Sequence, residues 1–152
     1  MWGDSVRPED QLAIANLAAR YCDAVNAADA AAWAGTWAPS CRWQPGPDRV
    51  LEGREAVVAF WRTAMASFES VVQIAGHGQV RADGDGAAGT WTLVEVSRRG
   101  GANGLLVGQY RDRYVQTAGA WLFAERRFTV LFRGSLPDGD FAGPRSLTGP
   151  DR

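Results

Sequence analysis

The chain is poor in the residues with which proteins bind metals and form disulfide bonds. Its 152 residues include one histidine and two cysteines, Cys22 and Cys41. Two cysteines are too few for a disulfide framework, and no paired cysteines or histidines offer a metal site. A Walker loop and a Gly-x-Ser-x-Gly nucleophile elbow are also missing. We therefore expect neither a metalloenzyme nor a nucleotide-dependent enzyme, and no cofactor.

Long apolar runs and an excess of either charge are also missing. No run approaches the ~18 residues of a transmembrane helix, and the polar segment 3–10 lacks the apolar core of a signal peptide. Sixteen basic against seventeen acidic residues leave no positive excess for nucleic acid or an anionic membrane. We expect a partner that is uncharged or small and a reducing, cytoplasmic location, with no nucleic-acid or membrane partner.

Tryptophan, by contrast, is abundant. Seven tryptophans are more than a domain of this size needs in its core, and 46% hydrophobic content suffices for a single domain. Such residues can wall an apolar ligand cavity, although a dimer interface or an ordinary core would use them too. They are Trp2, Trp33, Trp37, Trp43, Trp61, Trp91 and Trp121.

Helical periodicity dominates the first part of the chain. After Pro8, apolar residues recur at three- and four-residue steps, which predicts a first helix of roughly five turns. Asp29 is a good N-cap for a second, short helix that we expect to run to about Trp37, where Pro39 stops it. Apolar spacing over residues 54–68 predicts a third helix.

Strand-like alternation follows from residue 71 onward. Helices followed by an antiparallel meander predict an α+β fold, with three N-terminal helices packed on one face of a curved antiparallel sheet. We expect one domain over residues 1–136 and a mobile tail, rich in glycine, proline and aspartate, over residues 137–152. The predicted hairpin-linked strands are 71–81, 87–99, 105–115 and 120–132, with a short strand at 41–44 before them.

The strand at 105–115 carries a carboxylate between two aromatic side chains. Tyr110, Asp112 and Tyr114 alternate along the strand and therefore share one face. If that face lines a cavity, burial disfavours the charged form of Asp112 and favours a neutral carboxyl that donates a hydrogen bond. The alternatives are exposure to solvent or an ion pair with a nearby arginine, namely Arg111, Arg113 or Arg126.

Two further residues are candidates for chemistry. Tyr21 falls on the apolar stripe of the first helix, so its hydroxyl needs a polar group, a water or a ligand, unless it is a core tyrosine bonded to backbone. His77 shares a strand face with Gln73 and Ala75 in the expected alternation. Histidine is the residue type most often used as an acid or base, which makes His77 a candidate, although a lone histidine beside glycines also suits a structural or exposed position.

A series of short segments over residues 9–132 carries a resemblance to a known family. The segments are the run 20–29, a tryptophan-containing helix ending Ala38-Pro39, Gly53-Arg54-Glu55-Ala56 before a helix, and Tyr110-x-Asp112-x-Tyr114 followed by Gly119-Ala-Trp121 and Arg126. In order and spacing they resemble SnoaL-like proteins of the nuclear transport factor-like superfamily, which includes ketosteroid isomerases, scytalone dehydratases and polyketide cyclases. The resemblance implies a cone-shaped sheet with an apolar pocket at its open end. It also implies a homodimer formed through the outer sheet face at Thr90, Thr92, Val94 and Val96.

The chemical parallel is with ketosteroid isomerase, in which a tyrosine and a protonated aspartic acid hydrogen-bond to an enolate oxygen. The resemblance matches these two residues to Tyr21 and Asp112. It does not match the family's general base, because this chain has Gln-Pro-Gly at residues 44–46 and proline accepts no proton. His77, or less readily Asp48, is left to move the proton.

We therefore hypothesise a cofactor-independent isomerase, cyclase or dehydratase that acts on an apolar carbonyl compound of the polyketide, terpenoid or steroid type. Tyr21, Asp112 and His77 would be its catalytic residues. The alternative, favoured by the missing base, is a non-catalytic ligand-binding module or an accessory subunit of the ring-hydroxylating dioxygenase type. The predicted substrate pocket is lined by Trp37, Trp43, Trp61, Gln73, Tyr110 and Phe123.

Overall fold

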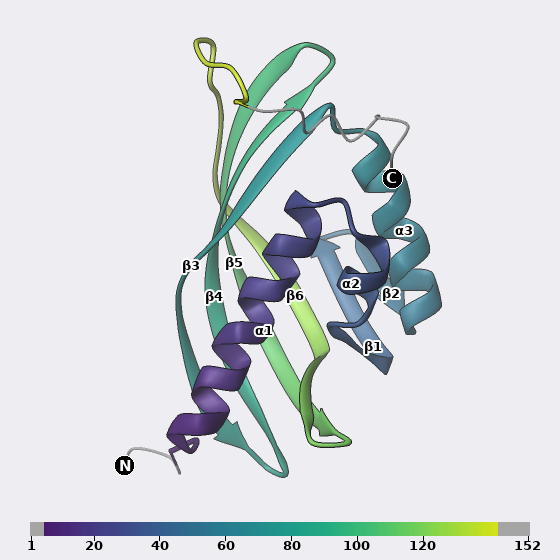
Figure 1. Cartoon of the computed structure of the whole chain (residues 1–152), viewed down its shortest axis with the longest axis vertical. Coiled ribbons are helices and arrows are strands. Elements are labelled where there is room, and N and C mark those ends of the chain that lie inside the picture. Colours follow the sequence, from purple (N-terminus) through teal and green to yellow (C-terminus); the bar gives the residue numbers. More distant parts are fainter. Residues whose placement is uncertain (1–4, 143–152) are drawn as a thin grey trace.

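The computed structural model describes residues 5–142, in which three helices pack on one side of a curved six-stranded sheet (Figure 1). The predicted α+β class, with helices before the long strands, is confirmed. The helices are α1 (Pro8–Asn26), α2 (Ala30–Ala34) and α3 (Arg54–Ala66). The strands are β1 (Trp37–Gly46), β2 (Arg49–Glu52), β3 (Ser70–Asp83), β4 (Gly86–Arg99), β5 (Ala102–Thr117) and β6 (Ala120–Ser135).

The sheet has the strand order β2-β1-β6-β5-β4-β3. Strands β3 to β6 form the predicted antiparallel meander of hairpins. Strand β1 adds one parallel pair, because it lies alongside β6 in the same direction, while β2 pairs with β1 in the opposite direction. A parallel pair needs a long connection, which α3 and the other strands of the meander provide between β1 and β6. The sheet is therefore mixed.

The second helix is shorter than its sequence pattern predicts. Asp29 caps it as expected, since its Oδ1 accepts a hydrogen bond from a backbone N–H of the first turn at 2.9 Å. The helix ends at Ala34, however, and Trp37 begins β1 instead of closing the helix. Pro39 lies within β1 where the pairing with β6 is irregular, a position that tolerates a missing N–H. Trp33 and Trp37 thus come from different elements.

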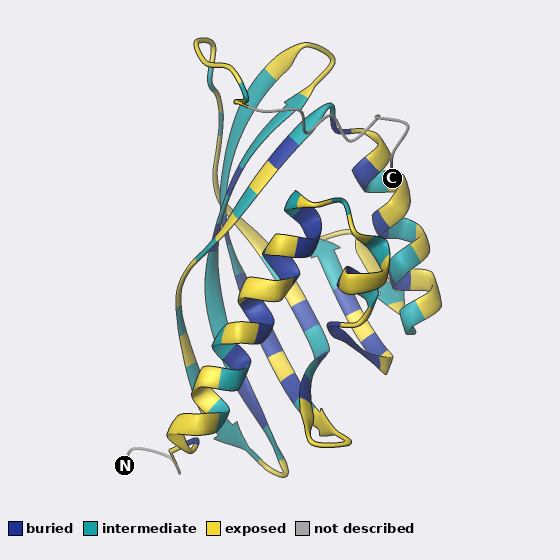
Figure 2. Cartoon of the chain, in the orientation of Figure 1, coloured by how far each residue is buried: buried dark blue, intermediate teal, exposed yellow. Residues whose placement is uncertain are grey.

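The core lies between the helices and the inner face of the sheet, where the buried residues gather in Figure 2. The predicted apolar stripe of α1 is buried, and Ala24 is buried in addition. Helix α3 ends two residues before its predicted end at Phe68. The outer face of the sheet carries large exposed apolar side chains, including Ile74 and Phe132. No helix within residues 5–142 is long and apolar enough to cross a membrane.

The chain ends fall partly outside the part that the structure describes. Residues 1–4, with Trp2, and residues 143–152 lie outside it. Residues 137–142, the described part of the expected tail, contain no helix or strand. The mobility of that tail and the domain boundary at residue 136 therefore stay predictions.

Candidate functional site

A buried ion pair lies on the inner face of the sheet. Arg126 on β6 donates from Nε and Nη2 to the two carboxylate oxygens of Asp112 on β5, at 2.8 and 3.0 Å. The two residues are direct neighbours across the strands, and their side chains are only 2% and 0% exposed. A two-pronged bond of this kind fixes the plane of the guanidinium as well as its position.

Three aromatic rings surround the guanidinium of Arg126. Its central carbon lies 3.6 Å from the ring centroid of Tyr110, 3.9 Å from that of Phe123 and 4.4 Å from that of Tyr21. The negative faces of aromatic rings attract a cation at such distances. The positive charge is therefore held inside the protein by one carboxylate and three rings.

Two tyrosine hydroxyls meet beside this cation. The oxygens of Tyr21 on α1 and Tyr110 on β5 are 3.2 Å apart, and both residues are buried. One hydroxyl donates to the other, so the second proton of the pair is free for another acceptor. Burial raises the pKa of Tyr21 to about 12 and that of Tyr110 well above its usual value, while the charge of Arg126 opposes both shifts. Both phenols are neutral at physiological pH, next to a charge that favours an anion.

A second set of hydrogen bonds holds Asp112. The Tyr114 hydroxyl donates to Asp112 Oδ2 at 2.9 Å, and Trp91 Nε1 donates to the Tyr114 hydroxyl at 2.8 Å. Burial raises the pKa of Asp112, whereas Arg126 and Tyr114 act in the opposite direction. The Arg126 and Tyr114 groups that contact Asp112 are all donors, so the charged carboxylate fits this environment better than the neutral acid.

These contacts give Asp112 a role different from the one predicted. The sequence led us to expect a neutral Asp112 that shares one ligand oxygen with Tyr21. In the structure Asp112 accepts hydrogen bonds from Arg126 and Tyr114, and the hydroxyl of Tyr21 bonds instead to Tyr110. The arrangement matches the alternative in which Arg126 is the partner of Asp112. Tyr21 does lie on the buried stripe with a polar partner.

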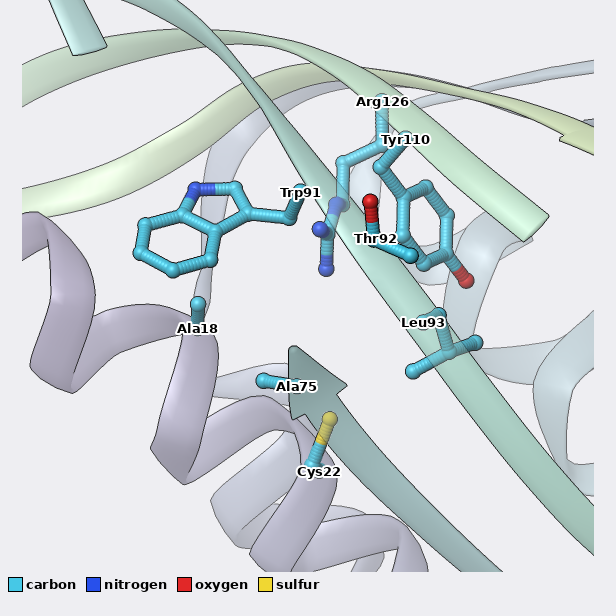
Figure 3. Close-up of a pocket in the computed structure, with 8 residues that line it drawn as sticks. All are labelled: Ala18, Cys22, Ala75, Trp91, Thr92, Leu93, Tyr110 and Arg126. Carbon is cyan, nitrogen blue, oxygen red and sulfur yellow. The ribbon is translucent and has the colours of Figure 1, made fainter. Parts of the chain in front are cut away.

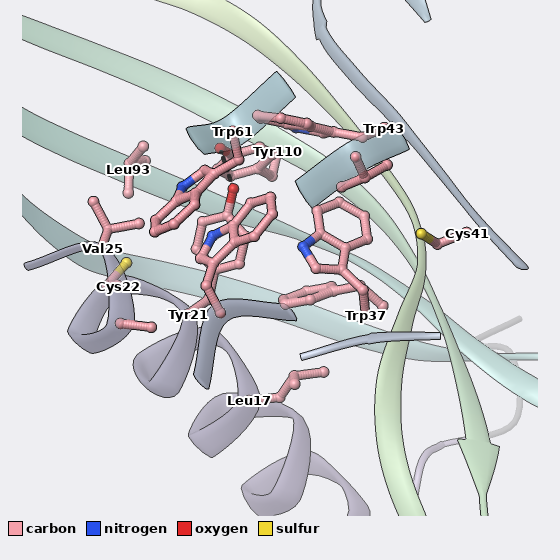
Figure 4. Packing of buried hydrophobic residues seen from close by; sticks show 14 of the residues in the cluster. Leu17, Tyr21, Cys22, Val25, Trp37, Cys41, Trp43, Trp61, Leu93 and Tyr110 are labelled. Carbon is pink, nitrogen blue, oxygen red and sulfur yellow. Dashed lines mark hydrogen bonds between the residues drawn. The ribbon is translucent and has the colours of Figure 1, made fainter. Parts of the chain in front are cut away.

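The predicted pocket residues gather in the core, but they pack against one another (Figure 4). Trp33 stacks on Trp61 with ring centroids 4.6 Å apart, and Trp37 and Trp43 lie 6.0 Å apart. Among the residues that the structure describes, the indole N–H groups of Trp33, Trp37 and Trp43 are buried and find no hydrogen-bond acceptor. The predicted residues in this cluster are Trp37, Trp43, Trp61, Tyr110 and Phe123.

A small cavity opens next to the ion pair, between α1 and the strands (Figure 3). Its volume is about 10 Å³, enough for one water molecule. Arg126 and Tyr110 border it from the sheet, and Cys22 borders it from α1. Burial raises the pKa of the Cys22 thiol to about 11, so this thiol is a neutral wall of the cavity. A ligand larger than water must displace side chains of the aromatic cluster.

His77 lies on the outer face of the sheet, contrary to the predicted alternation. The pairing of β3 with β4 shifts after Ala75, so that two β3 residues, Gly76 and His77, face Thr92 alone. Such a bulge reverses the alternation of side chains. His77 is exposed, and its Nε2 lies 3.1 Å from Thr92 Oγ1. The prediction that it shares the inner face with Gln73 is wrong, and it does not face the tyrosine pair.

Glu95 is an inward-facing carboxyl that our interpretation of the sequence missed. It is 8% exposed, and Gln73 Nε2 donates to its Oε2 at 2.8 Å. Burial raises the pKa of Glu95, while Gln73 and the positive charges of Arg99 and Arg133 oppose the rise. The signal was present in the sequence of β4. Glu95 is two residues from Leu93 and shares its face, and we had assigned the opposite face, with Val94 and Val96, to the outside of the sheet.

Metal-binding side chains do not gather at this site. Within residues 5–142, no group of three or more histidine, cysteine, aspartate or glutamate side chains is arranged to bind a metal ion. Cys22 and Cys41 are both buried as free thiols. The polar groups that meet on the inner face include instead phenols, carboxyls, the Gln73 amide and the Arg126 guanidinium.

Comparison with known proteins gives one family and many similar structures. A family model described as a SnoaL-like domain matches residues 6–127. No curated protein matches the sequence. The match thus runs from α1 into β6 just past Arg126, and it includes the ion pair, the tyrosine pair and Glu95.

Solved structures share the fold. A hexachlorocyclohexane dehydrochlorinase, LinA type 2, has a TM-score of 0.80 at 16% identity, over 90% of this chain and 95% of that one. Rv3472, a protein of unknown function from Mycobacterium tuberculosis, has a TM-score of 0.74 at 25% identity, over 82% and 77%. An NTF2-like protein with a cystatin-like fold from Novosphingobium aromaticivorans has a TM-score of 0.69 at 25% identity, over 81% and 82%. The predicted nuclear transport factor-like fold is confirmed, and the chain belongs to the SnoaL-like domain family.

Proposed function

We propose that the chain is a cofactor-independent lyase or isomerase that acts on an apolar, carbonyl-containing small molecule of the polyketide, terpenoid or steroid type. The observation that carries this proposal is the buried hydroxyl pair of Tyr21 and Tyr110 beside the Arg126 cation. The family adds support, since one similar structure is a dehydrochlorinase. Fold likeness alone does not identify a reaction, so the site carries the argument.

In the proposed reaction, the free proton of the tyrosine pair hydrogen-bonds to the carbonyl oxygen of the substrate. A water molecule, for which the cavity beside Arg126 has room, accepts a proton from the neighbouring carbon. The carbonyl becomes an enolate, and the negative oxygen is stabilised by the tyrosine donor and by the charge of Arg126. Return of the proton to a different carbon gives an isomer. Departure of a leaving group from the next carbon gives an unsaturated product instead. Neither path requires an oxidant or a reductant.

Asp112 acts as a positioning residue in this proposal. Its oxygens are occupied by Arg126 and by Tyr114, so it fixes the guanidinium against the tyrosine rings and does not touch the substrate. Removal of one preorganised donor to an oxyanion typically lowers the rate by about 10²–10³-fold. Asp112 thus holds the Arg126 cation at the place where negative charge develops on the substrate oxygen.

An absorbance assay tests the proposal without knowledge of the natural substrate. Isomerisation of a β,γ-unsaturated ketone and dehydration of a β-hydroxy ketone both yield a conjugated enone that absorbs in the ultraviolet. We expect conversion of members of such a panel without added cofactor. The double change Tyr21→Phe and Tyr110→Phe should lower the rate at least about 100-fold. Trp121→Phe is the control, because it removes a donor to Asp10 elsewhere in the fold. An undiminished rate in the double variant contradicts the proposal.

The packed interior favours a second candidate, a non-catalytic ligand-binding module or an accessory subunit of the ring-hydroxylating dioxygenase type. The cavity beside Arg126 has room for only one water, and the aromatic cluster is packed beside it. Native mass spectrometry of the purified protein separates the candidates. A retained apolar molecule that the protein never converts supports the binding module, whereas turnover of that molecule supports the enzyme.

We also propose a homodimer formed through the outer sheet face. Ile74 and Phe132 are 54% and 53% exposed there, on the same side as the predicted contact residues Val94 and Val96. Burying such apolar side chains stabilises association. Light scattering should give twice the 16.4 kDa of one chain, and Ile74→Lys should reduce it to one chain. The free thiols of Cys22 and Cys41 fit the proposed cytoplasmic location.

A further inference from the structure

The pair formed by Gln73 and Glu95 is the second polar feature of the inner face. Strand β3 is an edge strand of the sheet, and Gln73 is the direct neighbour of Glu95 across the β3–β4 pair. Asn26, at the end of α1, binds both backbone groups of Gln73: its Nδ2 donates to the carbonyl at 3.0 Å, and its Oδ1 accepts from the N–H at 2.6 Å. The side chain of Gln73 donates to Glu95 at 2.8 Å. The pair is therefore fixed by α1 as well as by the sheet.

This pair presents hydrogen-bond acceptors that lack donors. Gln73 Oε1 is buried and has no partner in the described part of the chain. Glu95 is 8% exposed, and within residues 5–142 its carboxyl accepts one hydrogen bond, from Gln73. Buried acceptors without donors destabilise a folded protein unless a ligand or a water supplies the donor. The two side chains are thus arranged to accept from a hydroxyl or a similar donor.

The charges around Glu95 favour its acceptor form. Arg99 on β4 and Arg133 on β6 both oppose the rise in the pKa of Glu95 that burial causes. The field of Glu95 also reaches the Cys22 thiol, which borders the small cavity together with Arg126. The Glu95 carboxylate and the Arg126 cation thus both influence the Cys22 thiol at the cavity, with opposite effects on its pKa.

The distance between this pair and the tyrosine pair sets the size of a shared ligand. Tyr110 lies opposite Trp91 on β4, and Glu95 is four residues farther along the same strand and on the same face. Four residues of a strand span about 13 Å. The position between them on that face is Leu93, which lies opposite Gly108 and is buried, so a ligand that spans the two sites displaces its side chain. A molecule that contacts both sites therefore needs an elongated apolar skeleton with a polar group at each end.

We propose that Glu95 and Gln73 bind the hydroxyl group of an elongated, polycyclic substrate whose carbonyl group is bound at Tyr21 and Tyr110. This inference rests on the proposed function for the carbonyl end only. It narrows the substrate class to fused-ring hydroxyketones of steroid or aromatic polyketide shape and disfavours small terpenoids. Glu95 accepts a hydrogen bond from the substrate hydroxyl, and the tyrosine pair donates one to the substrate carbonyl.

Two fluorescent probes test the inference by binding rather than by turnover. The first probe is 6-acetyl-2-naphthol, which has a carbonyl at one end and a hydroxyl at the other, and the second is 2-acetylnaphthalene, which lacks the hydroxyl. We expect the hydroxyketone to bind the protein about 10-fold or more tightly, because a hydrogen bond to a charged group contributes at least that much. Glu95→Leu should remove this difference and leave the affinity for 2-acetylnaphthalene unchanged.

Companion variants make the result specific. Glu95→Gln should retain part of the difference, since an amide oxygen still accepts, and Gln73→Leu should reduce it. Glu52→Leu is the matched control, because the Glu52 side chain is 77% exposed on β2, and it should change neither affinity. Circular dichroism of each variant verifies that the fold is intact before binding is compared.

The possible outcomes separate this inference from the proposed function. If the hydroxyl adds no affinity while Tyr21→Phe weakens both ketones, the inference is wrong and the carbonyl site stands. If Glu95→Leu acts only on the hydroxyketone while Tyr21→Phe weakens neither probe, the inference stands and the proposed function falls. Failure of both probes to bind at millimolar concentration overturns both.

Discussion

Arg126 and Asp112 form a two-pronged ion pair, with N–O distances of 2.8 and 3.0 Å, in which both side chains are almost fully buried. Each charge is costly to bury alone, and together they are tolerated because the geometry is close to ideal. The pair also fixes where the positive charge lies, which is against the rings of Tyr21, Tyr110 and Phe123. Stability and the proposed chemistry therefore depend on the same contact.

Asp112→Asn should destabilise the fold by about 3–5 kcal/mol, because it leaves the Arg126 cation buried without its counter-charge. Urea unfolding followed by tryptophan fluorescence measures the change. Asp83→Asn is the matched control, since Asp83 pairs with Arg113 at the surface at 3.4 Å and should lose less than about 1 kcal/mol. Replacing both members, with Asp112→Leu and Arg126→Met, should restore most of the loss. Equal losses at Asp112 and Asp83 would refute this view of the pair.

Stability should fall as the pH rises through the titration of Glu95. Burial raises the folded-state pKa of this carboxyl above its ordinary value of 4.5, so the folded protein binds the proton more tightly than the unfolded chain. The contribution of the neutral acid is thus complete below the unfolded-state pKa and is lost above the folded-state pKa.

Glu95→Gln removes this titration and should raise the thermal midpoint at neutral pH relative to the wild-type protein. The gain should disappear as the pH falls below 4.5, where the wild-type carboxyl is already neutral. Thermal melts of both proteins from acid to neutral pH provide the comparison. A gain that is the same at every pH would mean that the effect does not come from the charge of Glu95.

Gly78→Ala should destabilise the protein by about 1–3 kcal/mol. A Cβ atom at Gly78 would lie 2.4 Å from ring atoms of Trp91, whose N–H supports the Tyr114 hydroxyl. The ring must move, and the bond from Trp91 to Tyr114 should weaken. Gly46→Ala is the control, because an added Cβ there meets nothing within 4 Å. Unfolding midpoints that do not differ between these two variants would contradict the close packing of Trp91.

Asp29→Ala should cost about 0.5–2 kcal/mol, since it removes the side-chain cap from the N-terminus of α2. The effect should be local, because α2 has only five residues and places Trp33 in the core. Hydrogen exchange at the backbone N–H of Ala32 should speed up more than exchange in α1. Asp48→Ala, a change outside every helix, serves as the comparison.

Local features of this fold could be predicted from the sequence because they depend on neighbouring residues. The apolar stripe with Tyr21, the cap at Asp29 and the four hairpin-linked strands all follow from periodicity and turn chemistry. The family was predicted on the same basis, from the order of short segments, and the match to residues 6–127 confirms it.

Features that depend on strand register could not be predicted in the same way. A bulge after Ala75 turned His77 outward, and no local signal distinguishes such a bulge from regular alternation. Trp37 entered β1 because it pairs with Phe123, which is far away in the sequence. Likewise, three arginines were possible partners of Asp112, and the pairing of β5 with β6 selected Arg126.

The most direct test of the account concerns the tyrosine pair and Arg126, which we propose bind an oxygen that carries negative charge. Titration of the protein with 4-nitrophenol measures this, because the absorbance distinguishes the bound phenol from the bound phenolate. The account predicts that the bound probe has a lower pKa than the free probe, and that Tyr21→Phe with Tyr110→Phe weakens phenolate binding at least about 10-fold. A probe that binds in its neutral form, or with the same affinity to the double variant, would contradict it.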